Sequence, residues 1–146
     1  MRLDEIDRQI VAMLAKDGRA SFATVGQRVG LSAPAVKRRV DRLRATGVIK
    51  GFVAVVDPAA AGWGTEAFVE LFCEGRTAAT EIFAGLRRHP EVAAAYTITG
   101  DANALIHLRT RDIEHLEETL ERLRREPNIV QTKTAIVLSS LGRIPG

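Results

Sequence analysis

The sequence predicts an α+β chain in which a small helical domain precedes a larger domain built on an antiparallel sheet. Three observations carry this prediction. The first 45 residues show helical apolar periodicity, interrupted by helix-capping residues. A valine-rich, strand-like segment follows at residues 50–58. Two similar segments, LRRHPEV at residues 86–92 and LRREPNI at residues 123–129, then indicate a duplicated strand-helix-strand unit.

Composition narrows the class of protein. The 146 residues are 46% hydrophobic and 27% charged, which is typical of a folded protein. We expect no membrane span, because no apolar run approaches the roughly 20 residues that one needs, and the polar N-terminus does not resemble a secretory signal. A single cysteine excludes an internal disulfide framework. A reducing, cytoplasmic location is therefore the default expectation.

Charge is distributed unevenly along the chain. Residues 1–50 carry 11 Lys/Arg against 5 Asp/Glu, a net +6, whereas residues 51–146 carry 10 against 13, a net −3. This asymmetry predicts two modules, the first of which meets a polyanion. From charge alone, a solvated basic face without a partner fits equally well.

The first predicted helix covers residues 3–16. Asp4 is a plausible N-cap, and Gly18 can adopt the left-handed conformation of a C-cap. The apolar positions recur at helical spacing and form one stripe: Ile6, Ile10, Met13 and Leu14.

Ser21 is the predicted N-cap of a second, shorter helix. Its apolar positions are Phe22, Val25 and Val29. Gly26 lies inside this helix at a cost of about 1 kcal/mol relative to alanine, which indicates a close approach by a neighbouring segment. The turn at residues 29–31 is too short for anything but a sharp angle, as in a helix-turn-helix.

The third helix begins after Ser32 and carries Pro34 in its first turn. Its buried stripe is Val36, Val40 and Leu43, and Arg38 lies about 200° around the helix from Val36. A helix that starts with small side chains can enter the major groove of DNA, with cations behind it that reach phosphates or guanine. The alternative is an exposed amphipathic helix with ordinary solubilising charges.

This geometry gives a set of candidate DNA-binding residues. Those expected at base edges are Ala33, Pro34, Lys37 and Arg38. Those expected at phosphates are Ser32, Arg39, Arg42 and Ser21.

After the helices, residues 50–58 read as a strand that ends at an Asp-Pro pair. Because a lone strand is unstable, it must pair, and the same strand of a second subunit is one candidate. Strands at residues 66–74 and 102–110 then precede helices, the second at residues 112–125, and a further strand follows each helix. The order β-α-β, β-α-β predicts one antiparallel sheet with two helices on one face. Its other face, with Phe68, Phe72 and Val137, is left uncovered and predicts self-association.

Catalytic and metal-binding patterns are missing from the sequence, so we expect neither an enzyme nor a metal site. His89, His107 and His115 have no Cys or carboxylate at metal-ligand spacing on one face. The acidic residues of the last helix favour a solvated face with i,i+4 partners rather than paired catalytic acids.

A series of motifs is similar to the Lrp/AsnC (leucine-responsive, or feast-famine) family of prokaryotic transcription regulators. The motifs are LDEID at residues 3–7, DGR at 17–19, VGLS at 29–32, VKRRV at 36–40, GVIKGF at 47–52 and TGD at 99–101. The resemblance implies a winged-type helix-turn-helix at residues 1–50, a linker strand at 51–64, and a ferredoxin-like (RAM- or ACT-like) domain at 65–146 for effector binding and oligomerisation. It also implies double-stranded DNA as a partner, homodimers that commonly assemble to octamers, and a nucleoid-associated, cytoplasmic location.

Members of this family commonly bind a small effector, usually an amino acid, against the loop after the second strand of the regulatory domain. In this chain the loop is Thr99, Gly100, Asp101, Ala102 and Asn103, with Thr132 and Thr134 on the last strand as a candidate polar wall. Gly100 permits close backbone approach to a carboxylate, and Asp101 or Asn103 can accept an ammonium. The family usually reads Gly-Asp-aromatic-Asp, so Ala102 and Asn103 depart from it. A plain β-hairpin turn is the alternative.

Three functions follow from these observations. The first is a sequence-specific DNA-binding transcriptional regulator whose assembly responds to an amino acid, with no other cofactor. The second is an architectural protein that wraps or bridges DNA without an effector, and the departure at residues 102–103 motivates it. The third is a small-molecule-binding subunit that acts on an enzyme; the basic first third of the chain argues against it.

Overall fold

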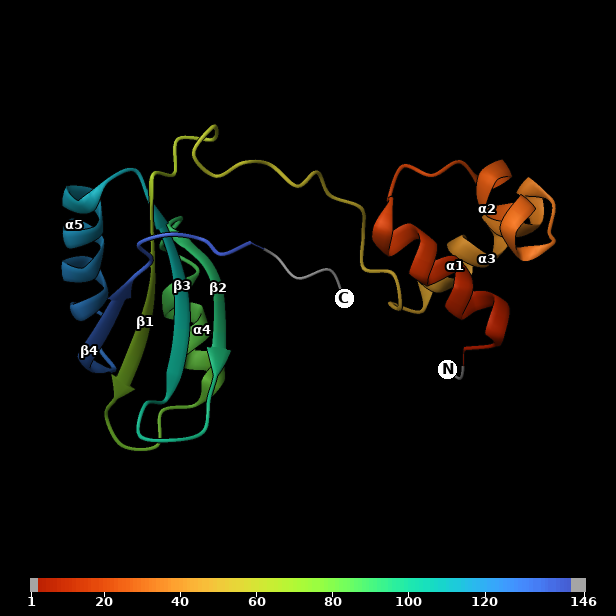
Figure 1. Cartoon of the computed structure of the whole chain (residues 1–146). Coiled ribbons are helices and arrows are strands. Elements are labelled where there is room, and N and C mark those ends of the chain that lie inside the picture. Colours follow the sequence, from red (N-terminus) through yellow and green to blue (C-terminus); the bar gives the residue numbers. More distant parts are fainter. Residues whose placement is uncertain (1–2, 143–146) are drawn as a thin grey trace. The chain divides into compact units, whose positions relative to one another are not determined.

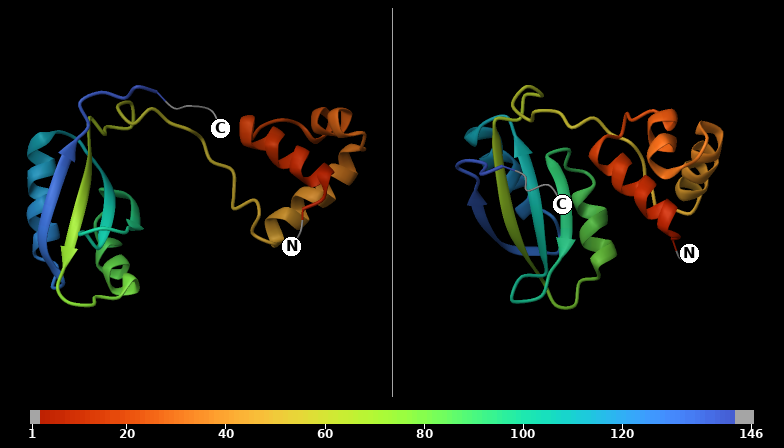
Figure 2. Two further views of the ribbon diagram at one scale, coloured as in Figure 1. Left: turned by 60° about the horizontal axis from the view of Figure 1, so that its bottom comes forward. Right: turned by 45° about the vertical axis from the view of Figure 1, so that its right-hand side comes forward.

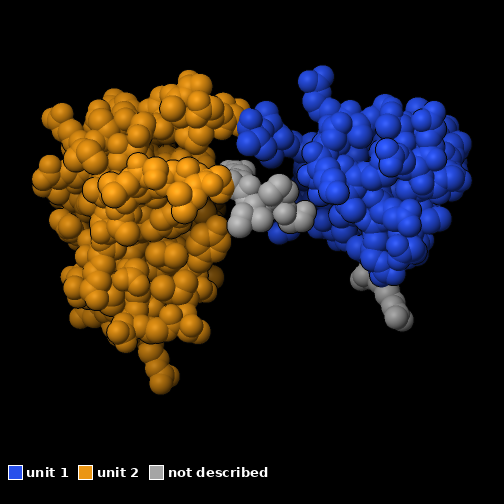
Figure 3. Space-filling view, viewed as in Figure 1, with its two compact units in different colours: residues 1–55 blue, residues 56–146 orange. Residues whose placement is uncertain are grey.

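The computed structural model describes residues 3–142 and divides the chain into two compact units, residues 1–55 and 56–146 (Figure 3). The first unit is helical, and the second contains an antiparallel sheet and two helices (Figure 1). The predicted α+β class is confirmed, and so is the predicted order of elements apart from the strand expected at residues 50–58. In the part of the chain that the structure describes, no helix has the length and apolar character needed to cross a bilayer.

Unit 1 consists of helices α1 (Glu5–Lys16), α2 (Phe22–Val29) and α3 (Ala33–Ala45). The three predicted N-caps are confirmed, because each side chain accepts a hydrogen bond from a backbone N–H in the first turn: Asp4 from Asp7, Ser21 from Thr24, and Ser32 from Ala35.

The core of unit 1 joins the apolar stripes of all three helices. Its most buried residues are Ile10, Leu14, Val25, Val36, Val40 and Leu43. The predicted stripe of α3 is therefore confirmed, and its polar face is turned away from this core.

The α2–α3 turn shows why a glycine is needed inside α2. A Cβ added at Gly26 would lie 2.3 Å from the carbonyl oxygen of Leu31, and the backbone N–H of Leu31 donates to Gly26 O at 2.9 Å. Gly30 ends α2 with a φ of 70°. The predicted close approach is confirmed, and it is made by the backbone of the turn.

The end of α1 differs from the prediction. Gly18 does not adopt a positive φ, and the C-cap is Asp17 in an extended conformation. The Asp17 side chain instead accepts a hydrogen bond from the N–H of Arg19 at 2.9 Å, which turns the chain. Gly18 lies close to Phe52, whose ring would be 3.4 Å from an added Cβ. This is an ordinary van der Waals distance, so neither crowding nor a left-handed backbone requires glycine at this position.

Residues 51–57 form neither a strand nor a helix. The strand predicted here is therefore not formed within one chain, and the described part of unit 1 contains no strand that could act as a wing. The physical reason is the absence of a pairing partner, since an isolated strand has no ladder to join. Val53 and Val55 are 89% and 80% exposed, so pairing with a second subunit stays a prediction.

Unit 2 contains β1 (Thr65–Cys73), α4 (Ala79–Leu86), β2 (Val92–Thr97), β3 (Ala104–Thr110), α5 (Ile113–Arg124) and β4 (Ile129–Ile136). The four strands form one antiparallel sheet in the order β2-β3-β1-β4 (Figure 2). The central strands β1 and β3 come from different repeats, so each repeat depends on the other for its sheet partners. This is the predicted split βαβ arrangement.

One face of the sheet is covered by both helices. Side chains of α4 and α5 pack with the inward positions of β1 and β3, and the most buried members are Val69, Leu71, Leu86, Ile106, Leu108 and Leu123. On the opposite face, Phe68 is 41% exposed and stacks on His107 with ring centroids 4.7 Å apart. None of the described elements covers this second face, which confirms the predicted open side.

Candidate DNA-binding and effector sites

The start of α3 presents small side chains to solvent. Ser32 and Pro34 are exposed, and Ala33 and Ala35 are half-buried. Ser32 Oγ accepts from the backbone N–H of Ala35 at 3.4 Å, so the serine is both a cap and an exposed hydroxyl. Nothing bulky projects from this first turn, and a base edge could approach its backbone closely.

Two exposed cations follow on α3. Lys37 Nζ lies 2.6 Å from Asp41 Oδ2, in an i,i+4 pair whose side chains are 62% and 52% exposed. The Arg38 guanidinium makes no hydrogen bond or ion pair with any residue that the structure describes. Arg38 is therefore available to a ligand; Arg44, near the end of α3, is also exposed and has no side-chain partner among the described residues.

The other two cations of this face are engaged within unit 1. Arg39 Nη1 lies 2.6 Å from Asp4 Oδ2 and 2.8 Å from Asp7 Oδ1, and Arg42 Nη2 lies 2.7 Å from Asp7 Oδ2. Asp7 is only 2% exposed. These ion pairs join α1 to α3, and they give Arg39 and Arg42 a structural partner that the sequence-based prediction did not include. Their predicted phosphate contacts are untested and would require these ion pairs to open.

The ion pairs between α1 and α3 shift the pKa values of Arg39 and Asp4. The hydrogen bonds that Arg39 donates to Asp4 and Asp7 raise the pKa of its guanidinium. A hydrogen bond from Arg39, followed by one from the backbone of Asp7, lowers the pKa of the Asp4 carboxyl. Asp7 could have been found from the sequence, because it lies three residues before Ile10 and seven before Leu14. A carboxylate in an apolar stripe needs a buried partner.

Ser21, the remaining predicted phosphate contact, lies at the start of α2. Its exposed hydroxyl accepts from the N–H of Thr24 at 3.0 Å and is 2.8 Å from the Thr24 hydroxyl. Both hydroxyls border free N–H groups of a helix N-terminus, which is suited to an anion.

The predicted effector loop connects β2 to β3. Gly100 has a φ of 111°, which is strained for other residues, and Thr99 and Asp101 are exposed. Ala102 is 5% exposed and belongs to the interior. Asn103 ties the loop to the end of β1: its Oδ1 accepts from Cys73 N at 2.7 Å, and its N–H donates to Leu71 O at 2.9 Å. The Asn103 oxygen therefore has a structural partner already.

Thr132 and Thr134 do not join this loop within one chain. They pair with Leu71 and Val69 of β1, and β1 separates β4 from β3. Both line a groove of roughly 410 Å³ between α5 and β4, where Arg124 Nε donates to Thr132 Oγ1 at 3.1 Å. The predicted polar wall is thus assembled with the loop only if a second copy supplies one of the two parts.

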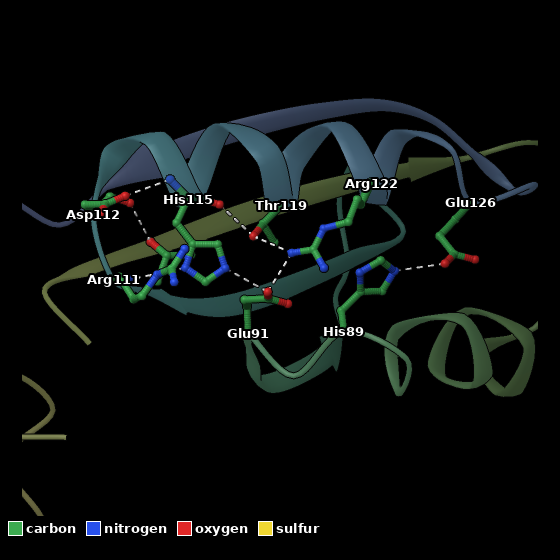
Figure 4. A network of polar contacts seen from close by, with 9 residues as sticks. His89, Glu91, Arg111, Asp112, His115, Thr119, Arg122 and Glu126 are labelled. Carbon is green, nitrogen blue, oxygen red and sulfur yellow. Dashed lines mark hydrogen bonds and ion pairs between the residues drawn. The ribbon is translucent and has the colours of Figure 1, made fainter. Parts of the chain in front are cut away.

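A polar network that was not predicted lies between the two repeats (Figure 4). His89 Nε2 lies 2.9 Å from Glu126 Oε1, and Glu91 Oε1 lies 2.9 Å from His115 Nε2 and 2.6 Å from Arg122 Nη2. Glu91 is 4% exposed, and its Oε2 has no partner among the described atoms. His89 and Glu126 occupy equivalent positions 37 residues apart in the two repeats, a relation that could have predicted their contact.

Two carboxyl groups of this network, those of Glu91 and Glu126, have lowered pKa values although Glu91 is buried and Glu126 is half-buried. Burial raises the pKa of Glu91, but hydrogen bonds from Arg122 and His115 outweigh it and leave that pKa below its ordinary value. Burial likewise raises the pKa of Glu126, but hydrogen bonds from His89 and Arg88 outweigh this effect and leave the pKa below its ordinary value. In the described residues, no group of three or more His, Cys, Asp or Glu side chains is arranged to hold a metal ion.

A helix-turn-helix unit is joined here to a separate α+β unit with an open sheet face, but this architecture alone does not fix a function. The chain belongs to the Lrp/AsnC family of transcriptional regulators. The AsnC-type helix-turn-helix domain matches residues 3–44, and the Lrp/AsnC ligand binding domain matches residues 66–144. The protein is thus a transcriptional regulator and not an enzyme.

Individual relatives extend over almost the whole chain. It is 49% identical over 140 residues to the HTH-type transcriptional regulator Rv2324 of Mycobacterium tuberculosis, which covers 96% of this chain and 95% of that protein. It is 33% identical over 138 residues to the HTH-type transcriptional regulator FL11 of Pyrococcus horikoshii, with 94% and 91% covered. The feast or famine regulatory protein Rv3291c of M. tuberculosis, solved with L-methionine, matches with a TM-score of 0.91 at 34% identity, covering 97% and 96%.

Proposed function

We propose that this regulator binds specific DNA sequences by inserting the start of α3 into the major groove. Ala33, Pro34, Lys37 and Arg38 approach base edges, and Ser21 and Ser32 bind phosphates. The proposal rests on a helix start made of small residues, followed one turn later by Arg38, which is exposed and has no partner among the described residues. An arginine in this position can donate two hydrogen bonds to one guanine.

The substitution Arg38→Ala tests this assignment. We expect a loss of about 1–3 kcal/mol in specific binding, which is roughly five- to 150-fold in Kd. The measurement is a footprint and a fluorescence anisotropy titration on the DNA that flanks the protein's own gene. Arg8→Ala, which removes one arginine from the exposed side of α1, is the matched control. An equal affinity and footprint for Arg38→Ala and the wild type would contradict the assignment.

We further propose that an amino acid or a related metabolite is the effector and binds at the loop of residues 99–103. Gly100 allows backbone N–H groups to meet a carboxylate, and the exposed Asp101 can accept an ammonium. Two structurally similar proteins, Rv3291c and NMB0573 of Neisseria meningitidis, were solved with L-methionine, which supports this class of ligand.

A thermal-shift screen of all amino acids tests the effector proposal. A ligand of the native state should raise the melting temperature in proportion to the logarithm of its concentration above Kd. Asp101→Ala should abolish the shift, whereas Asp57→Ala, a charge removal in the linker, should retain it. A shift that survives Asp101→Ala would move the ligand to another site.

The effector would act by favouring one assembly over another, which changes the spacing of paired α3 helices along DNA. Homodimers, and octamers built from them, are the proposed assemblies, and the open sheet face with Phe68 supports such contacts. The proposed place of action is the nucleoid in the cytoplasm of a prokaryote. Light scattering with and without ligand tests the assembly step; a mass equal to one chain under all conditions would contradict it.

A second candidate function is an architectural protein that wraps or bridges DNA without an effector. It is favoured by one observation: Ala102 is buried, and the Asn103 oxygen is occupied by Cys73 N, so this loop offers fewer ligand contacts than the family pattern would. The same thermal-shift screen separates the two functions. No stabilising amino acid, together with extended footprints of many helical turns, would favour the architectural role.

A further inference from the structure

Four of the five cations of α3 divide into two groups, and the fifth, Arg44, is exposed near the end of the helix. Lys37 and Arg38 point to solvent, whereas Arg39 and Arg42 are turned toward a carboxylate of α1. Both oxygens of Asp7 are used: Oδ1 accepts from Arg39 at 2.8 Å, and Oδ2 accepts from Arg42 at 2.7 Å. The side chain of Arg42 is still 49% exposed, so it lies at the border between the interior of unit 1 and the solvent.

Arg42 follows Arg38 by four residues and therefore lies one helical turn further along nearly the same face of α3. With the start of α3 in the groove, a cation at this position can reach the DNA backbone. A phosphate contact by Arg42 would, however, remove one of the two partners of a carboxylate that is 2% exposed. An uncompensated buried charge is costly, so the contact is opposed.

Arg39 is held more firmly than Arg42. It donates to Asp7 and also to Asp4, at 2.6 Å, and its side chain is only 25% exposed. Loss of Asp7 alone would leave Arg39 with Asp4, but it would leave Arg42 without an ion-pair partner among the described residues. The two arginines therefore differ in the number of carboxylate partners: Arg39 has two and Arg42 has one.

We propose that Asp7 is a positioning residue that sets DNA selectivity: by pairing with Arg42 it keeps this cation of α3 away from backbone phosphates. This pairing lowers the sequence-independent part of DNA affinity while leaving base contacts by Arg38 in place. The inference rests on the proposed role of α3 as the recognition helix.

The salt dependence of binding to a random-sequence duplex measures this effect, because each phosphate contact adds about 0.9 to the slope of log affinity against log salt. In the full-length protein, we expect Asp7→Asn to steepen the slope by about 0.9 per bound chain and to raise non-specific affinity about five- to tenfold at 0.1 M salt. Glu5→Gln is the matched control, since it also removes one carboxylate from α1 and changes the net charge by the same amount. The partner of Glu5 is Arg8, which does not lie on α3. The slope for Glu5→Gln should equal that of the wild type.

Two further variants identify the released cation. Adding Arg42→Gln to Asp7→Asn should return the slope to the wild-type value, and Arg42→Gln alone should leave it unchanged. The single variant Arg42→Gln keeps the test decisive if Asp7→Asn folds poorly. A melting curve of each variant monitors its folding. A slope for Asp7→Asn equal to or shallower than that of Glu5→Gln would overturn the proposal, and so would a shallower slope for Arg42→Gln alone.

Failure of this inference is distinguishable from failure of the DNA-binding assignment. If Arg38→Ala does not weaken specific binding, α3 is not the recognition helix and the proposed function is wrong. If Arg38→Ala weakens specific binding but Asp7→Asn and Glu5→Gln share one slope, only the role of Asp7 is wrong. A merely structural role for Asp7 would lower the melting temperature without steepening the slope.

Discussion

The two units each contain one buried carboxylate that gathers an arginine from a distant part of the chain, but the two carboxylates differ in how completely they are paired. Asp7 in unit 1 uses both oxygens, one for Arg39 and one for Arg42. Glu91 in unit 2 uses one oxygen for both Arg122 and His115, and the other has no partner among the described atoms. Asp7 thus joins two helices with both oxygens paired, whereas Glu91 retains one oxygen that can still accept a hydrogen bond.

Removal of each carboxylate gives the largest expected effect. We predict that Asp7→Ala lowers the free energy of unfolding of unit 1 by about 2–3 kcal/mol, below the 3–5 of a fully buried pair because both arginines can turn to water. Glu91→Ala should cost unit 2 only about 1–2 kcal/mol, since it also removes an unsatisfied oxygen. Hydrogen exchange in urea, followed separately in residues 5–45 and 65–136, measures both. An equal or larger loss for Glu91→Ala would contradict the comparison.

Protonation of these carboxylates in acid should lower the free energy of unfolding of unit 2 by less than their removal does, because a protonated side chain stays in place. The pKa values of Glu91 and Glu126 are lowered on folding, so their stabilisation is present above the unfolded-state value and is lost as pH falls through the folded-state value. We therefore expect the free energy of unfolding of unit 2 to fall as pH drops below about 4.5. Glu91→Gln should flatten this dependence in a urea titration at several pH values. A pH profile that is unaltered by Glu91→Gln would show that Glu91 does not contribute.

The half-buried, neutral side chain of Asn103 should contribute less to stability than the carboxylates of Asp7 and Glu91. Asn103→Ala removes the acceptor of Cys73 N, and we expect a loss of about 1 kcal/mol, seen as a lower melting temperature of unit 2. Asn103→Asp keeps an acceptor oxygen at the same place and is the control. Equal melting temperatures for the alanine variant and the wild type would show that the loop is not held by this bond.

The exposed pair of Lys37 and Asp41 gives the smallest expected effect. Asp41→Ala should change the free energy of unfolding of unit 1 by less than about 0.5 kcal/mol, because solvent screens a pair whose side chains are more than half exposed. A loss comparable to that of Asp7→Ala, in the same exchange experiment, would mean that burial does not decide the strength of these anchors.

Sequence patterns predicted local features of both units well. Caps such as Asp4 and Ser32 form bonds within four residues, so the sequence alone contains both partners. The apolar stripe of α3 and the order of strands and helices in the repeats follow from periodicity in the same way. These features position the start of α3, and for that reason the candidate DNA-binding surface was predictable in outline.

Long-range pairings were not predictable from those patterns. Arg42 and Asp7 are 35 residues apart, and Asn103 and Cys73 are 30 apart. Their contacts depend on helix crossing and strand register, which periodicity does not encode. Thr132 and Thr134 show the same limit: they were predicted beside the loop of residues 99–103, but register places them across β1, in the groove under α5.

In the proposed function, the two units have separate ligands: α3 of unit 1 contacts DNA, and the β2–β3 loop of unit 2 contacts the effector. Hydrogen exchange of the full-length protein, measured separately with a duplex from its own upstream region and with each stabilising amino acid, tests this claim most directly. We expect DNA to slow exchange within residues 21–42 and the amino acid to slow exchange within the loop of residues 99–103. Protection of residues 99–103 by DNA with none in α3, or of α3 by the amino acid in the absence of DNA, would contradict this claim.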